Sequence, residues 1–189
     1  MAFFVSPASK FERAMRALLI LQGKATWSDA FISNESKPAT RALPNRTIIA
    51  TSFSPTRPYR PEGVCHMEIW HHFDGIDQPN QTPNSQQTAM DSYLGDTFDT
   101  LNLGGALNAT DMSPLADAIT AAGRWLAIPD ANDTTGQAAL IVAANADMVN
   151  FRCDWVKLST PLTTRGSDKS TTNWVEIIHL SAFVSHASN

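Results

Sequence analysis

The strongest constraint on the fold is a strict alternation of side chains in two segments, 64–73 and 173–184. Successive side chains of a β-strand point to opposite faces, so a period of two is typical of a strand with one buried face. In the first segment the predicted inner face carries Cys65, Met67, Ile69, His71 and Phe73. Segments 46–53, 137–144 and 151–158 have the β-branched, apolar or alternating content of strands as well. We therefore predict a largely antiparallel sheet.

Three other segments have the apolar spacing of helices. Ser6 can cap a helix whose first residue is Pro7, and apolar residues then recur every three or four positions to near Gly23. Ser113 and Pro114 begin a second helix in the same way. The third carries the apolar stripe Met90, Leu94, Phe98 and Leu101. The order of elements predicts an α+β fold, a mostly antiparallel β-sheet with an N-terminal helix and two central helices packed on one face.

The length of 189 residues favours a single domain spanning 1–189. Two connections are long for such a domain. Residues 24–44 lack a period and are predicted to form an extended arm or an irregular connection. Residues 159–172 are a polar stretch between two predicted strands and are predicted to form a projecting hairpin loop.

The composition points away from nucleic-acid and membrane binding. Only 17% of the residues are charged, below the roughly 25% of an ordinary soluble domain, and 14 basic against 18 acidic residues give a net charge of −4. Polarity comes instead from 18 Thr, 16 Ser and 11 Asn, which suit turns, strands and wet protein interfaces. No basic cluster is long enough to grip DNA, and no apolar run is long enough to span a bilayer. We expect a soluble protein without a membrane partner.

The candidate chemical groups do not converge on a site. His66 and His72 lie about 20 Å apart along a strand that rises about 3.3 Å per residue, and His71 points to the other face. The two cysteines, Cys65 and Cys153, lie within predicted strands, where a thiol is usually buried and inert. Motifs for nucleophilic serine, phosphate-binding, zinc-protease and dinucleotide sites are absent from the sequence. We expect no enzymatic activity, no metal and no cofactor.

Two tryptophans raise the alternative of an interaction surface. Trp70 and Trp174 lie in predicted strands among polar neighbours. Protein interfaces are enriched in aromatic residues and depleted in Lys and Glu, which matches this composition. Packing in a core on a second face of the sheet would explain the two tryptophans equally well.

Three runs of sequence carry a family resemblance. They are LPNRTIIATSFSPTRPYRPEGVCHMEIWHHFDG, the helical MDSYLGDTFDTL, and the terminal strand NWVEIIHLSAFV, which follows a polar hairpin loop. In this order they resemble the tail terminator, or tail completion, proteins of long-tailed bacteriophages. The resemblance is one of pattern and covers nearly the whole chain. The arm at 24–44 and the helix that begins at Ser113 have no counterpart in that pattern.

The resemblance implies a structural virion protein of the tail or neck, assembled in the host cytoplasm. Copies of the chain would form a six-membered ring that caps the tail tube protein and meets the head-tail connector or stopper protein. Genomic DNA would pass through the lumen without sequence-specific binding. The hairpin residues Arg165, Asp168 and Lys169 would face the lumen or the neighbouring ring, whereas an idle hairpin tip is the plainer explanation of the same residues.

Two alternatives stay open at this point. Within the same class, the chain could be a neck or stopper protein, or a minor tail or capsid protein. From a different class, it could be a small dimeric α+β enzyme or ligand-binding domain that uses His66 or His71 beside Glu68. A ring-forming protein and a zinc-containing enzyme differ in oligomeric state and in metal content.

Overall fold

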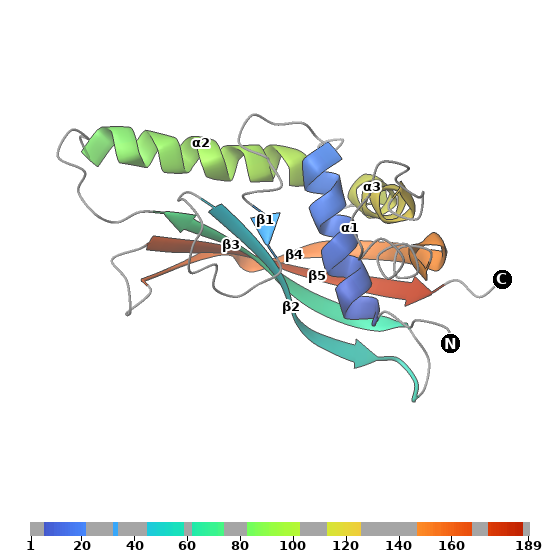
Figure 1. Cartoon of the computed structure of the whole chain (residues 1–189). Helices are drawn as coiled ribbons and strands as arrows, with labels where there is room; N and C mark the ends of the chain where they lie inside the picture. The colour runs from blue at the N-terminus through green and yellow to red at the C-terminus, as the bar shows by residue number, and fades with distance from the viewer. Residues whose placement is uncertain are drawn as a thin grey trace, which may run out of the picture.

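The molecule has two layers, a β-sheet and a layer of helices that covers one face of it. The structure is a computed structural model that describes residues 6–21, 32–33, 45–58, 62–73, 83–102, 113–125, 147–167 and 174–186. Figure 1 shows all three α-helices on the same side of the sheet: α1 (Pro7–Leu21), α2 (Pro83–Leu101) and α3 (Ser113–Trp125). The predicted α+β class, with three helices on one face of a mostly antiparallel sheet, is confirmed.

Four long strands form the antiparallel part of the sheet: β2 (Asn45–Pro55), β3 (Gly63–Phe73), β4 (Phe151–Ser167) and β5 (Trp174–His186). A two-residue strand, β1 (Ile32–Ser33), pairs parallel with the start of β2. The spatial order is β1-β2-β3-β5-β4, so the C-terminal strand lies in the interior and β4 forms an edge. A short 3-10 turn, η3 (Asp147–Asn150), leads into β4.

The alternation in the sequence predicts the inner face of β3 correctly. Cys65, Met67, Ile69 and His71 are each at most 1% exposed, whereas the residues between them are partly or fully exposed. The helix start is also as predicted, because the Ser6 hydroxyl accepts a hydrogen bond from the backbone N–H of Ser9 at 3.2 Å. The sequence therefore predicts both the buried face of β3 and the start of α1 correctly.

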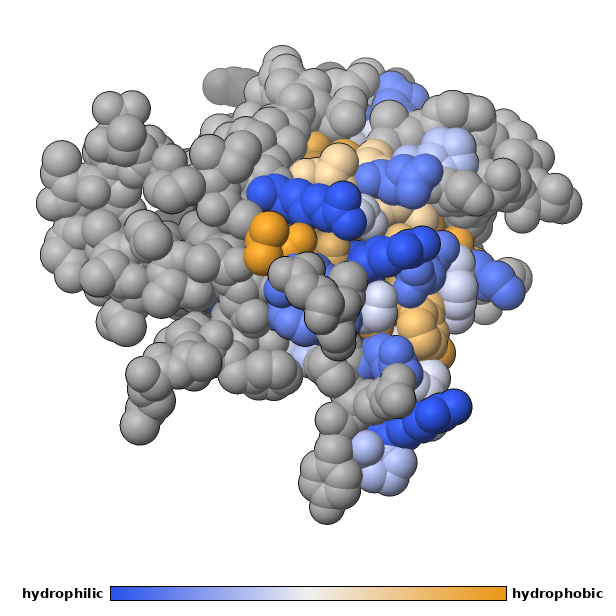
Figure 2. All heavy atoms as spheres, turned by 90° about the vertical axis from the view of Figure 1, so that its right-hand side faces the viewer, coloured by the Kyte–Doolittle hydropathy of each residue, from blue (hydrophilic) through white to orange (hydrophobic). Residues whose placement is uncertain are grey.

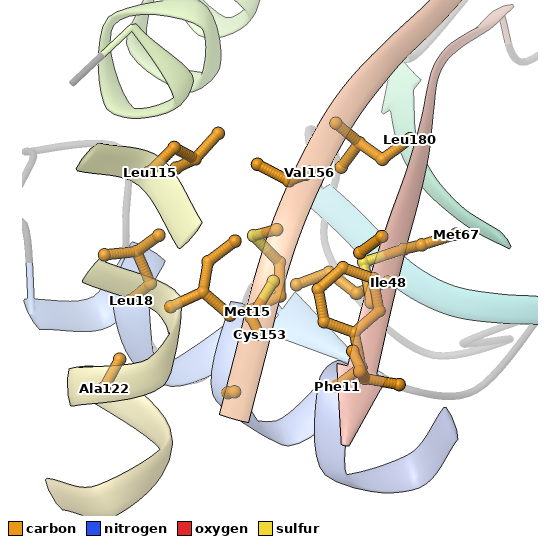
Figure 3. Packing of buried hydrophobic residues seen from close by; sticks show 14 of the residues in the cluster. Phe11, Met15, Leu18, Ile48, Met67, Leu115, Ala122, Cys153, Val156 and Leu180 are labelled. Atoms are coloured by element: carbon orange, nitrogen blue, oxygen red, sulfur yellow. The ribbon is translucent and has the colours of Figure 1, made fainter. Parts of the chain in front are cut away.

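The core lies between the helices and the inner face of the sheet. Figure 3 shows side chains of α1 and α3 meeting those of the sheet strands in one cluster. Its fully buried members include Phe11, Met15, Leu115, Ile48 and Leu180. Fully burying one such side chain contributes about 1.5–3 kcal/mol, so this cluster is the main source of stability.

The two helices α1 and α3 pack closely because one residue of α3 has no side chain. A Cβ atom placed on Gly123 would lie 2.6 Å from Cδ1 of Phe151 and 3.3 Å from Cβ of Ala14. Glycine therefore permits α3 to approach both the start of β4 and α1 at this point.

Two predicted element boundaries are wrong. The loop predicted over 159–172 is strand as far as Ser167, because β4 resumes pairing with β5 at Thr163 after a register shift that follows Leu158. A polar, threonine-rich stretch can form a strand where its partner supplies the backbone hydrogen bonds, so polarity alone is a poor loop signal. The helix predicted from the apolar stripe that starts at Met90 begins earlier, at Pro83, because proline is well suited to a first helical position.

Some predictions fall largely outside the described residues. The strand predicted over 137–144 lies there entirely, and so do residues 168–173 at the tip of the β4–β5 hairpin. Of the predicted arm at 24–44, the structure describes β1, whose extended backbone pairs with β2.

Candidate functional site

The face of the sheet turned away from the helices is the candidate interaction surface, and we call it the open face. No helix of the described residues lies against it (Figure 1). Most of its side chains are partly or fully exposed, in contrast to the inner face. Across the four long strands the described residues of the open face include Thr47, Ile49, Ser52, Val64, His66, Glu68, Trp70, His72, Arg152, Trp155, Lys157, Ile177, His179, Ser181, Phe183 and Ser185.

One end of the open face is aromatic. Trp155 and Phe183 are directly opposite each other on β4 and β5, with ring centroids 6.4 Å apart. The Trp155 side chain is 36% exposed, and the Nζ atom of Lys157 lies 5.5 Å from the centre of its ring. Val64 continues this row on β3 as the partner of Phe183. An exposed aromatic beside a cation is a common feature of protein contact surfaces.

The centre of the open face is polar, and its groups are paired across strands. Glu68 Oε1 lies 3.4 Å from Nδ1 of His179, which is its direct cross-strand neighbour. The Trp70 indole N–H donates to Glu68 Oε2 at 2.7 Å, so this carboxylate holds a tryptophan and a histidine in place. His66 Nδ1 is 2.9 Å from the Ser181 hydroxyl in the next row.

The enzyme alternative names Glu68 together with His66 or His71. The structure places the Glu68 carboxylate against His179 and Trp70. His71 lies on the inner face, fully buried, and His72 Nε2 is 3.2 Å from the Thr47 hydroxyl. Within the described part of the chain, no group of three or more His, Cys, Asp or Glu residues could hold a metal ion.

On the inner face a buried chain of hydrogen-bonded side chains joins α2 to the sheet. The Thr97 hydroxyl oxygen accepts the Nε–H of Arg46 at 3.2 Å and lies 2.8 Å from Nε2 of His71. His71 Nδ1 lies 3.1 Å from the backbone carbonyl of Glu176. Because a carbonyl can only accept, Nδ1 carries the proton and Nε2 accepts the Thr97 hydroxyl. Every link in this chain then has one donor and one acceptor.

This chain of hydrogen bonds requires His71 to be neutral. Burial, and then the positive charge of Arg46, lower the pKa of His71 to about 3. Arg46, His71 and Glu176 are cross-strand neighbours in one row, and Arg165 is the residue opposite Glu176 on β4. The row is closed to substrate because its first two side chains are fully buried. Through Arg46 and His71 the row is hydrogen-bonded to Thr97 of α2.

Both cysteines are buried, as their position in strands predicts. Burial raises the pKa of Cys65 to about 12 and that of Cys153 to about 12, with nearby carboxylates adding to the effect. The protonated thiol is therefore favoured at both positions near neutral pH.

Helix side chains bind backbone N–H groups at two points where the strand pairing of β2 and β4 is irregular. Next to the register shift in β2, Oε1 of Glu12 accepts the backbone N–H of Ala50 at 2.6 Å. Next to the shift in β4, the Thr120 hydroxyl accepts the backbone N–H of Cys153 at 2.9 Å. Covering backbone groups and interrupting the ladder both disfavour pairing with a further strand. The helix layer thus blocks edge-to-edge association at these points.

The structure tests only some of the site residues predicted from sequence. Trp70 lies on the open face and is half-buried. Trp174 begins β5 opposite Phe73 and Ser167. Arg165 lies in β4, whereas Asp168 and Lys169 are outside the described residues.

Sequence reasoning missed the residues that give the open face its character. The sequence predicts a strand around Trp155 and another around Phe183, but their pairing depends on the register of β4 against β5. Alternation in both strands was the available signal. It predicts the face of each residue but not which residues meet across strands.

The comparisons give no family. No model of a known protein family matches the chain, and no curated protein matches it either. Among the helices that the structure describes, none combines the length and apolar character needed to cross a membrane. Figure 2 shows that the described residues on the side seen at the right of Figure 1 include both hydrophilic and hydrophobic ones.

Proposed function

We propose that the protein is a ring-forming structural subunit of a bacteriophage tail, of the tail terminator type. The observation that carries the proposal is the open face, a broad strand surface that no described helix covers and that combines exposed aromatics with paired polar groups. A surface of this mixture suits contact with other proteins, because aromatic area adds binding energy while the polar groups set orientation.

The ring geometry is supported by the two-layer architecture. A closed ring needs two different and complementary patches on each subunit, since each copy contacts one neighbour with one patch and the next neighbour with the other. The helix layer and the open face lie on opposite sides of the molecule and differ in composition (Figure 1). Helix side chains also cover the backbone N–H groups of Ala50 and Cys153 at two points of the sheet.

The β4–β5 hairpin supports a second set of contacts. The outer half of β4, from Thr163 to Ser167, pairs with Trp174–Ile178 of β5. In the proposed ring this hairpin, which carries Arg165, reaches towards the lumen or the adjoining ring of the tail tube protein or connector. The net charge of −4 is compatible with DNA sliding through a lumen without being held.

The decisive experiment measures assembly. Purified protein is examined by size-exclusion chromatography with light scattering, by electron microscopy, and after incubation with tail tubes from a tailed phage. A six-membered ring, free or at the end of a tube, supports the proposal. A stable monomer or dimer that binds no tubes at any concentration contradicts it, and stoichiometric zinc in such a dimer would favour the enzyme alternative.

A further inference from the structure

We draw no further inference here: the strongest candidate, the aromatic end of the open face where Trp155 and Phe183 meet beside Lys157, belongs to the surface on which the proposed function already rests, and nothing in the structure shows what covers it.

Discussion

The hydroxyl of Thr97 connects α2 to the sheet, and its removal is the sharpest test of the fold. Thr97→Val keeps the shape of the side chain but deletes the oxygen that lies 3.2 Å from Arg46 Nε and 2.8 Å from His71 Nε2. No cavity forms, because valine fills the same volume. The expected loss of stability therefore comes from two buried polar atoms that lose a hydrogen-bond partner.

The magnitude follows from the cost of leaving such atoms unpaired. Each buried unsatisfied group costs about 1–3 kcal/mol, so the loss of two partners in Thr97→Val should lower the free energy of unfolding by about 2–6 kcal/mol. Thr100→Val is the matched control, since Thr100 is also buried on α2 but donates only to the carbonyl of Asp96 one turn earlier in the same helix. That substitution should cost about 0.5 kcal/mol or less.

Urea unfolding followed by circular dichroism measures both values. At a slope of about 2 kcal/mol per molar urea, the Thr97→Val midpoint should fall by about 1–3 M, while the Thr100→Val midpoint should move by about 0.3 M or less. Equal, small losses for the two variants would show that the buried chain does not hold α2 in place. The reasoning about the inner face would then be wrong.

Three further predictions concern groups in fixed environments. The lowered pKa of His71, about 3, means that the unfolded chain binds more protons below about pH 6.5, so stability falls as the pH drops. Between pH 7 and pH 5 the titration of His71 lowers the free energy of unfolding by about 2 kcal/mol. Urea unfolding of His71→Gln should therefore show a smaller loss of stability over this pH range than the unaltered protein. Gly123→Ala should lower the free energy of unfolding by about 1–3 kcal/mol through overpacking, whereas Gly95→Ala should raise that of the monomer by about 0.5–1 kcal/mol. Thermal unfolding in dilute solution shows whether each variant is less or more stable than the unaltered protein. Thiol reagents at pH 8 should modify native protein far more slowly than urea-unfolded protein at both cysteines, Cys65 and Cys153, and equal rates would contradict their burial.

The sequence alone determined the local elements and their faces. A period of two predicted the buried side of β3, and the Ser6-Pro7 and Ser113-Pro114 pairs predicted where α1 and α3 begin. These features depend on backbone geometry and on neighbours a few positions apart. The α+β class followed from the order of such elements. Local pattern failed where polarity was taken for a loop, as in the outer half of β4.

Only the tertiary structure decided which residues meet. The pairing of Trp155 with Phe183 and of Glu68 with His179 depends on strand register, and the chain from Arg46 through Thr97 to His71 joins three elements. None of these partners is near in sequence except where two strands form a hairpin. Register and helix placement are set by the core as a whole, since a shift of one residue would turn the apolar face outward. For that reason the separation of a buried inner row from a partly exposed open face can be seen only in the assembled sheet.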